Sequence, residues 1–236
     1  MFQTPPPTAR PLRAALFDVD GTLVDTNDLH TAAWREAFLH FGHDFPLETI
    51  RGQVGKGGDN LIPTLLPGTP DSQAEEMDAY RGDLFKRDYL PRAVPFPGVR
   101  PLFERLVEDK VRIVLASSSS NAEVDFHLNL IGCADLVSAV TTRDDVESSK
   151  PCPDIFAAAL LKVAPIQAAD AVVIGDTPWD MKAALKVGVR TIAFRCGGFP
   201  DDWLRESGAS FLYNDARDFL ARYDRSPFGA LTHAEA

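Results

Sequence analysis

Short apolar runs alternate with amphipathic segments along most of the chain. Runs that lack an alternating polar face are typical of strands buried on both sides of a parallel sheet. Such strands are predicted at residues 14–19, 111–116, 136–140, 171–175 and 191–194. Helical segments lie between most of them, at residues 98–109, 121–131, 153–163 and 179–187. Strands and helices that alternate with short connections predict βαβ units, and therefore an α/β protein with an open, doubly wound parallel sheet.

The interval from residue 25 to residue 95 departs from this pattern. It contains no convincing β-branched run, but helical segments are predicted at residues 29–41, 61–66 and 74–89. We therefore expect a helical cap inserted after the first strand, with a hinge at its two connections. The expected division is a cap at 25–95, a discontinuous core at 12–24 and 96–225, and poorly ordered tails at 1–11 and 226–236.

Composition and charge exclude several classes of protein. Hydrophobic residues make up 45% of the 236 residues and charged residues 25%, which is typical of a compact globular chain. The net charge of −10 argues against a nucleic-acid partner. The three cysteines are far apart and predict neither a disulfide framework nor a zinc site. Because no apolar run approaches the roughly 20 residues of a membrane span and no signal peptide is evident, we expect a cytoplasmic enzyme without membrane partners.

Two carboxylates stand at the end of the first predicted strand. Asp18 and Asp20 follow the apolar residues, and Gly21 then turns the chain. Because open α/β sheets bind ligands at the carboxyl ends of their strands, both side chains are expected at a ligand site. A turn in which Asp20 and Gly21 have a purely structural role is the alternative when this motif is taken alone.

Hydroxyl groups and a lysine stand at two further turning points. The second strand runs into the four serines at 117–120 before a helix begins. A helix N-terminus can bind an oxyanion, although serines there also act as helix caps. Lys150 precedes a Pro-Cys-Pro turn that opens the next helix, so its backbone is expected to be extended and its ammonium directed. A lone lysine is more often a solvated surface group, so Lys150 indicates a functional site only in combination with the other motifs.

A third strand ends in Asp176, and Asp180 follows it at the start of a helix, where it could act only as a charge that favours the helix dipole. Because parallel strands align their carboxyl ends, the acids of these motifs are expected to meet at one edge. Two unit charges about 4 Å apart repel by roughly 4 kcal/mol at an effective dielectric constant of 20, so several aspartates require a cation. Carboxylate oxygens without nearby His or Cys favour Mg²⁺.

The segments DVDGTLVDT, ASSSS, SKPCPD and GDTPWDMKAA resemble, in order and spacing, the four motifs of the haloacid dehalogenase superfamily over about residues 13–215. The resemblance implies a five-stranded Rossmann-like core with a helical cap. It also implies that Asp18 is the nucleophile that forms an aspartyl phosphate. Asp20 would be the general acid and then the general base. Ser117 and Lys150 would hold the phosphate.

The same resemblance implies a Mg²⁺ site. Its ligands would be Asp18, the backbone carbonyl of Asp20 and Asp176, with Asp180 as a further ligand or a neighbouring acid. Cys152 occupies the variable position of the third motif and receives no role.

The first helix of the cap is similar to the β-phosphoglucomutase and phosphoglycolate phosphatase branch. His30 lies twelve residues after Asp18, the spacing of a mutase histidine that contacts the acid/base, although a helix-surface histidine is the alternative. The glycine-rich segment 51–60 fits neither a Walker loop nor a dinucleotide loop. We expect Arg51 and Lys56 in this segment to meet the distal end of the substrate, with a plain turn as the alternative. Ser118 is also expected to bind substrate.

These observations predict a Mg²⁺-dependent phosphatase that hydrolyses a small phosphorylated metabolite, either a sugar phosphate or a phosphoglycolate-like compound. The dehalogenase branch lacks an acid at the place of Asp20, which favours phosphoryl transfer. A β-phosphoglucomutase-type mutase is the alternative enzyme, and a receiver-like phospho-accepting module is the alternative outside enzymes. Asp20 and the cap argue against the receiver, which has no use for a leaving-group acid or a lid. The sequence leaves both a monomer and a homodimer open.

Overall fold

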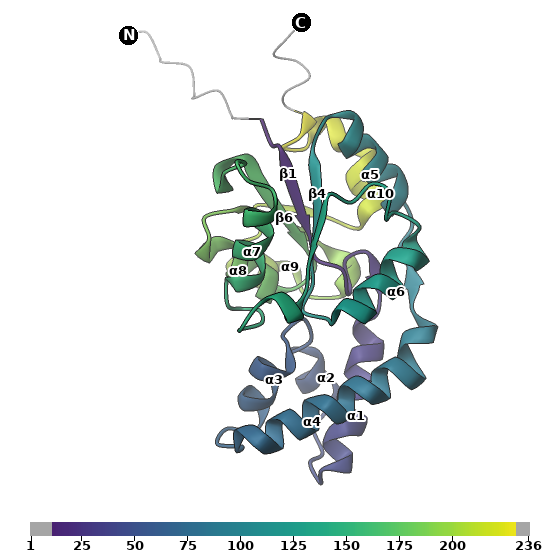
Figure 1. Cartoon of the computed structure of the whole chain (residues 1–236), viewed down its shortest axis with the longest axis vertical. Coiled ribbons are helices and arrows are strands. Elements are labelled where there is room, and N and C mark those ends of the chain that lie inside the picture. Colours follow the sequence, from purple (N-terminus) through teal and green to yellow (C-terminus); the bar gives the residue numbers. More distant parts are fainter. Residues whose placement is uncertain (1–10, 230–236) are drawn as a thin grey trace, which may run out of the picture.

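The computed structural model describes residues 11–229 (Figure 1). A six-stranded sheet has the order β5-β4-β1-β6-β7-β8, and every neighbouring pair in it is parallel. Its strands are β1 (Ala14–Phe17), β4 (Arg112–Ala116), β5 (Ala139–Thr141), β6 (Ala171–Gly175), β7 (Arg190–Phe194) and β8 (Phe211–Tyr213). This order, in which the chain winds outward in both directions from β1, is the predicted doubly wound sheet.

Helices cover both faces of the sheet, and the side chains of β1 alternate between them. Ala15 and Phe17 pack in one apolar cluster with α5 (Val99–Glu108), α6 (Asn121–Ile131) and α10 (Ala216–Ala221). Ala14 and Leu16 pack in the other with α7 (Asp154–Lys162) and α8 (Pro178–Lys186). Because successive side chains of a strand point to opposite faces, a strand between two helical layers must be apolar throughout. The short helix α9 (Asp201–Glu206) completes the core.

The inserted helices lie together beyond one end of the sheet (Figure 1). They are α1 (Asn27–His40), α2 (Leu47–Arg51), α3 (Gly58–Leu65) and α4 (Asp71–Leu84), and α4 continues through a π-helical turn (Phe85–Tyr89) and a 3-10 turn (Leu90–Arg92). They enclose a small apolar cluster of their own around Trp34, Phe38 and Met77. Two short antiparallel strands, β2 (Val24–Asp25) and β3 (Val94–Pro95), join this helical cap to the core.

Several predicted boundaries need correction. The strand expected at 136–140 begins at Ala139, because Leu136 is held in a turn by a backbone hydrogen bond to Cys133. The sheet has a sixth strand, β8, which is too short to give a sequence signal, and α2 was not expected.

The tail expected from residue 226 onward is also partly wrong, because Ser226 and Phe228 are buried and the Phe228 ring packs against Phe219 and Tyr223. Residues 1–10 and 230–236, which make up most of the two expected tails, lie outside the described residues.

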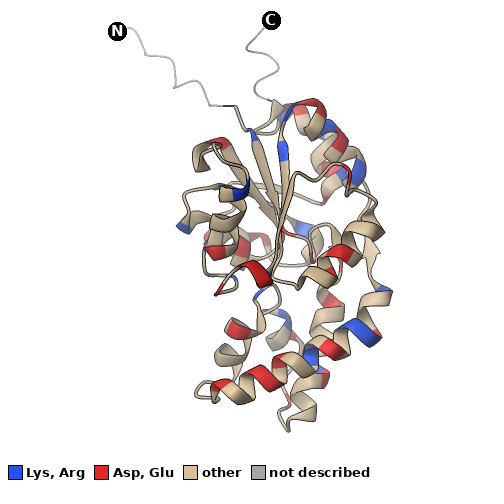
Figure 2. Cartoon of the chain, in the orientation of Figure 1, with Lys and Arg blue, Asp and Glu red and all other residues tan. Residues whose placement is uncertain are grey.

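Acidic and basic residues are intermixed along the ribbon of the core and the cap (Figure 2). Within residues 11–229, no helix combines the length and the apolar character that crossing a bilayer requires.

Candidate active site

The register of the sheet brings the first and fourth motifs together. Phe17 at the end of β1 lies opposite Leu115 of β4 and Ile174 of β6, so the residues that follow these strands emerge side by side. The backbone N–H of Asp18 donates to the carbonyl of Ile174 at 2.9 Å, which extends the pairing by one residue. Asp18, Ser117 and Asp176 therefore meet at the carboxyl edge of the sheet, as the sequence predicts.

Lys150 lies buried at this edge and forms ion pairs with Asp18 and, at 2.7 Å, with Asp180. Burial alone would lower the pKa of Lys150, but the attraction of the two carboxylates outweighs burial and raises the pKa above its ordinary value. Lys150 is therefore a fixed cation beside Asp18. The described structure thus unites the lysine of the third motif with acids of the first and fourth.

Asp18, Asp176 and Asp180 form a buried acidic group in which one oxygen atom from each lies within 4.8 Å of the others. Burial is the main reason that the pKa of Asp18 is raised to about 7; Lys150 opposes this rise, and the nearby acids add to it. Burial and the charges of Asp18 and Asp180 likewise raise the pKa of Asp176 well above its ordinary value. Lys150 alone does not compensate the negative charge, so the group fits a divalent cation.

The carboxylates of this acidic group all have protein partners. The hydroxyl of Thr22 lies 3.0 Å from Asp18 Oδ2 and 2.9 Å from Asp176 Oδ1. The other oxygen of Asp18 pairs with Lys150, and the other oxygen of Asp176 accepts from Asn27. Asp180 Oδ2 accepts from the backbone and hydroxyl of Thr177, and its Oδ1 lies 2.7 Å from Lys150. Asp180 therefore positions Lys150 in addition to being a possible ligand. The carboxylate of Asp20 lies outside the acidic group.

Asp20 is surrounded by hydrogen-bond donors. Thr26 donates to Oδ1 at 2.9 Å and Ser119 to Oδ2 at 2.8 Å, while the Ser117 hydroxyl lies 3.4 Å from Oδ2. His30 Nε2, from α1, lies 3.0 Å from Oδ1, which is the contact that its spacing from Asp18 implies. Burial would raise the pKa of Asp20, but the nearby histidines outweigh burial and hold it well below its ordinary range.

His127 is a site residue that the sequence analysis missed. Its side chain is fully buried on α6, and Nε2 lies 3.3 Å from the same oxygen of Asp20 that faces His30. Burial would lower the pKa of His127, but the attraction of Asp20 outweighs burial and raises it. A histidine on the apolar face of a helix, between Val124 and Leu128, gives no functional signal in a single sequence. Only its position two turns after the serine segment hints at this contact.

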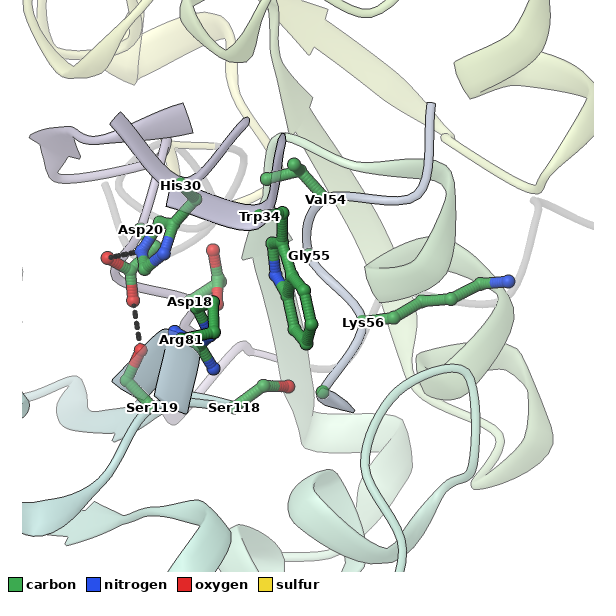
Figure 3. Close-up of a pocket in the computed structure, with 11 residues that line it drawn as sticks. Asp18, Asp20, His30, Trp34, Val54, Gly55, Lys56, Arg81, Ser118 and Ser119 are labelled. Carbon is green, nitrogen blue, oxygen red and sulfur yellow. Dashed lines mark hydrogen bonds and ion pairs between the residues drawn. The ribbon is translucent and has the colours of Figure 1, made fainter. Parts of the chain in front are cut away.

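A cavity of about 40 Å³ opens between the core and the cap (Figure 3). The core lines it with Asp18, Asp20, Ser118 and Ser119, and the cap with His30, Trp34, Arg81 and residues 54–57. The predicted substrate residues His30 and Ser118 therefore face the same space as the predicted nucleophile. Arg81, in the last turn of α4, is a second residue that sequence analysis missed.

The other two cap residues are placed differently from the prediction. Lys56 lines the cavity, but its side chain extends away from Asp18 and Asp20 (Figure 3). Its ammonium donates to Gln53 at 2.7 Å and lies 4.1 Å from the ring centre of Trp179. Arg51 does not line the cavity, because its guanidinium pairs with Asp28 and donates to the carbonyl of Gly197. Lys56 therefore lines the cavity with its ammonium directed elsewhere, and Arg51 lies outside it, while the predicted contact of these two cations with the substrate stays a prediction.

This arrangement of motifs agrees with comparison to known proteins. The sequence model of the haloacid dehalogenase-like hydrolase family matches residues 15–194. The chain belongs to this family. The resemblance found in the four motifs is therefore confirmed, and so is the Rossmann-like fold class. The predicted enzyme class, a phosphoric monoester hydrolase, is confirmed as well.

Relatives of this HAD-like hydrolase include named phosphatases. A phosphoglycolate phosphatase of Nitrosospira multiformis is 31% identical over 189 residues, which cover 75% of this chain and 81% of that protein. A pyrophosphatase, PpaX, of Oceanobacillus iheyensis is 25% identical over 209 residues, with 89% of this chain and 95% of that protein covered. The solved structure of a hydrolase from Pseudomonas syringae has a TM-score of 0.85 at 29% identity and covers 91% of this chain and 99% of that chain.

Proposed function

We propose that this HAD-like hydrolase is a Mg²⁺-dependent phosphatase that hydrolyses a small phosphate monoester through an aspartyl phosphate on Asp18. The observation that carries the proposal is that Asp18 and Asp20 line one cavity, while a buried lysine pairs with the first and histidines surround the second. Two carboxylates two residues apart thus have different partners. In the described arrangement burial raises the pKa of Asp18 and the histidines lower the pKa of Asp20, so the proposed roles require a bound cation to lower the first pKa and a bound phosphoryl group to raise the second.

In the proposed first step, a carboxylate oxygen of Asp18 attacks phosphorus and the bond from phosphorus to the ester oxygen breaks. Lys150 and the hydroxyl of Ser117 hold the phosphoryl oxygens, and Asp20 gives its proton to the departing alcohol. The histidines keep Asp20 ionised in the described arrangement. A bound phosphoryl dianion would raise the pKa of Asp20 by repulsion, and so allow it to take up the proton that this step needs.

In the proposed second step, water attacks the phosphorus of the aspartyl phosphate. Asp20, now ionised, accepts a proton from this water, the acyl phosphate bond breaks, and the carboxylate of Asp18 is regenerated together with inorganic phosphate. Ser119 and Thr26 hold the carboxylate of Asp20 beside the cavity. Asp20 thus regains the proton that it gave to the alcohol in the first step.

Mg²⁺ would be held by Asp18 and Asp176, whose carboxylates share the Thr22 hydroxyl within the buried acidic group. When bound, the ion would neutralise charge that develops on the phosphoryl oxygens. Asp180 would position Lys150, and Asn27, which donates to Asp176 at 2.6 Å, would orient the second ligand.

The names of the relatives favour hydrolysis over the mutase reaction. One is a phosphoglycolate phosphatase and another a pyrophosphatase. His30 makes the contact expected of a mutase histidine, so the mutase remains the competing outcome of the experiment.

The test is a phosphate-release assay on a panel of small phosphate esters, hexose monophosphates and nucleotides, first with Mg²⁺ and then with a chelator. Release from small esters that stops on chelation and returns with added Mg²⁺ supports the proposal. Interconversion of hexose phosphate isomers without release of phosphate identifies a mutase. A stable phosphoprotein with no turnover identifies a phospho-accepting module.

A further inference from the structure

Arg81 places a buried cation on the cap side of the cavity. Its side chain projects from α4, and only 7% of the residue is exposed. It lines the same cavity as Asp18 and Asp20, and Figure 3 shows it on the side of these acids, opposite to the direction of Lys56. A buried guanidinium at a cavity is costly unless it binds an anion or is fully paired.

The pairing of Arg81 within the protein is incomplete. One terminal nitrogen donates to Asp78 at 3.0 Å, but Nε has no hydrogen-bond partner among the described residues. Asp78 is itself shared, because Arg143 from the core donates to its second oxygen at 3.1 Å. One carboxylate therefore serves two guanidinium groups, and Arg81 keeps both charge and N–H donors for a further anion.

Trp34 fixes the plane of this guanidinium. The central carbon of Arg81 lies 4.8 Å from the ring centre of Trp34, which itself lines the cavity. Stacking on an aromatic face restricts the side chain and leaves its edge, where the N–H groups are, directed sideways. Arg51 lies outside the cavity and the Lys56 side chain points away from the acids, so Arg81 is the one of these three cap cations that lines the cavity on the side of Asp18 and Asp20.

We propose, resting on the phosphatase function above, that Arg81 selects phosphate monoesters that carry a second anionic group, a carboxylate or a phosphate, within a few atoms of the reacting phosphoryl group. The core cation Lys150 is already paired with Asp18 and Asp180, so it serves the reacting end. The forked N–H groups of an arginine fit the two oxygens of a carboxylate or phosphate, and Arg81 lines the same cavity as Asp18, so the two anionic ends would occupy one cavity.

The experiment compares 2-phosphoglycolate with 2-hydroxyethyl phosphate, which has a similar size but a neutral distal end. Ethane-1,2-diol bisphosphate serves as the monoester probe in which the second anion is a phosphate. The catalytic efficiency kcat/KM is measured for the parent, for Arg81→Met, which keeps an apolar stem against Trp34, and for Arg81→Lys, which keeps the charge without the fork. Lys56→Met is the matched control, because it removes a cap cation that points away from the acids.

The parent is expected to prefer an anionic substrate over the neutral ester by about tenfold or more, the factor that a charged hydrogen bond typically contributes. Arg81→Met should lose this preference while hydrolysis of the neutral ester stays within about threefold, and Arg81→Lys should be intermediate. Lys56→Met should retain the preference. Comparing the two anionic probes decides whether the natural second anion is a carboxylate or a phosphate. It is the group carried by the probe for which kcat/KM falls more in Arg81→Met.

Equal efficiency of the parent on the charged and neutral esters would overturn the role of Arg81 and leave the phosphatase proposal intact. An equal loss on both esters in Arg81→Met, or the same loss of preference in Lys56→Met, would also overturn it. Absence of phosphate release from every ester would instead overturn the proposed function, and this inference with it.

Discussion

The core and cap sides of the cavity are built in different ways. On the core side, Asp18, Lys150 and Asp176 emerge from or beside strand ends, and at most 4% of each residue is exposed. On the cap side, Trp34 comes from the middle of α1 and Arg81 from the last turn of α4, and both meet the core only because the whole cap docks. The difference suggests a division of labour, in which the core sets the chemistry and the cap sets which molecule reaches it.

The largest effect should come from the nucleophile. Asp18→Asn should lower turnover by at least about 1,000-fold, because an amide cannot form the aspartyl phosphate. The loss should be the same for charged and neutral esters, since the core does not read the distal end. The unfolding temperature should not fall, because the change removes a carboxylate from a crowded acidic group and Lys150 keeps Asp180 as a partner. Turnover within about tenfold of the parent would contradict covalent catalysis by Asp18.

The next largest effect should be on the metal. Asp176→Asn should raise the Mg²⁺ concentration for half-maximal activity by about tenfold or more, while KM at saturating Mg²⁺ changes by less than about threefold. Binding of Mg²⁺ to the folded parent should raise its unfolding temperature, and the variant should lose most of this shift. An unchanged Mg²⁺ dependence together with an unchanged temperature shift would remove Asp176 from the metal site.

A smaller effect is expected at Asp20, where the core and the cap contribute one histidine each. His127→Asn should lower kcat by about tenfold with little change in KM, because it removes a group that holds the acid/base from the core side. His30→Asn is the matched variant from the cap. If the division of labour is correct, His127→Asn affects all esters equally, whereas a rise in KM confined to one substrate would place His127 in substrate recognition.

The same division explains what the sequence predicts. Asp18, Asp176 and Lys150 could be placed together because parallel register aligns strand ends, and a strand end is visible as the last apolar residue before a polar one. Which side chains of a cap helix will face the core has no such local signal in the sequence. Arg51 and Lys56 lie in the expected glycine-rich segment, but their charges are directed to Asp28, Gln53 and Trp179 by contacts that exist only after folding. His127 and Arg81 were missed for the same reason.

Strand and helix boundaries failed for a related physical reason. The apolar run at residues 136–140 has the composition of a strand, but only its end pairs with β4, because the preceding residues form the turn that leaves α6. Phe228 follows a proline and lies near the end of the chain, yet its ring fills a space beside Phe219. Tertiary packing determines the structure of both segments, and the local sequence pattern carries no information about that packing.

The smallest effect concerns docking of the cap itself. Gly57 precedes α3 with a φ of −72°, which alanine adopts without strain, so any cost of Gly57→Ala comes from space. A Cβ atom at this position would lie 2.2 Å from the hydroxyl of Ser149, the residue next to Lys150. The contact is part of the docked interface, because Ser149 also accepts from Asn60 at 2.8 Å and donates to Asp59 at 2.9 Å.

Gly57→Ala should therefore push the cap away from the loop that carries Lys150 and lower kcat/KM by about three- to tenfold, by the same factor for charged and neutral esters. Gly82→Ala in α4 is the matched control, because a Cβ atom there meets no atom within 4 Å. Alanine in a helix is favoured over glycine by about 1 kcal/mol, so this control should keep its activity and unfold at an equal or higher temperature. Full activity of Gly57→Ala would show that catalysis does not need this docked contact. A loss confined to charged esters would mean that the glycine-rich segment, as well as Arg81, selects the substrate. It would contradict the view that α4 selects the substrate while this segment only closes the cap.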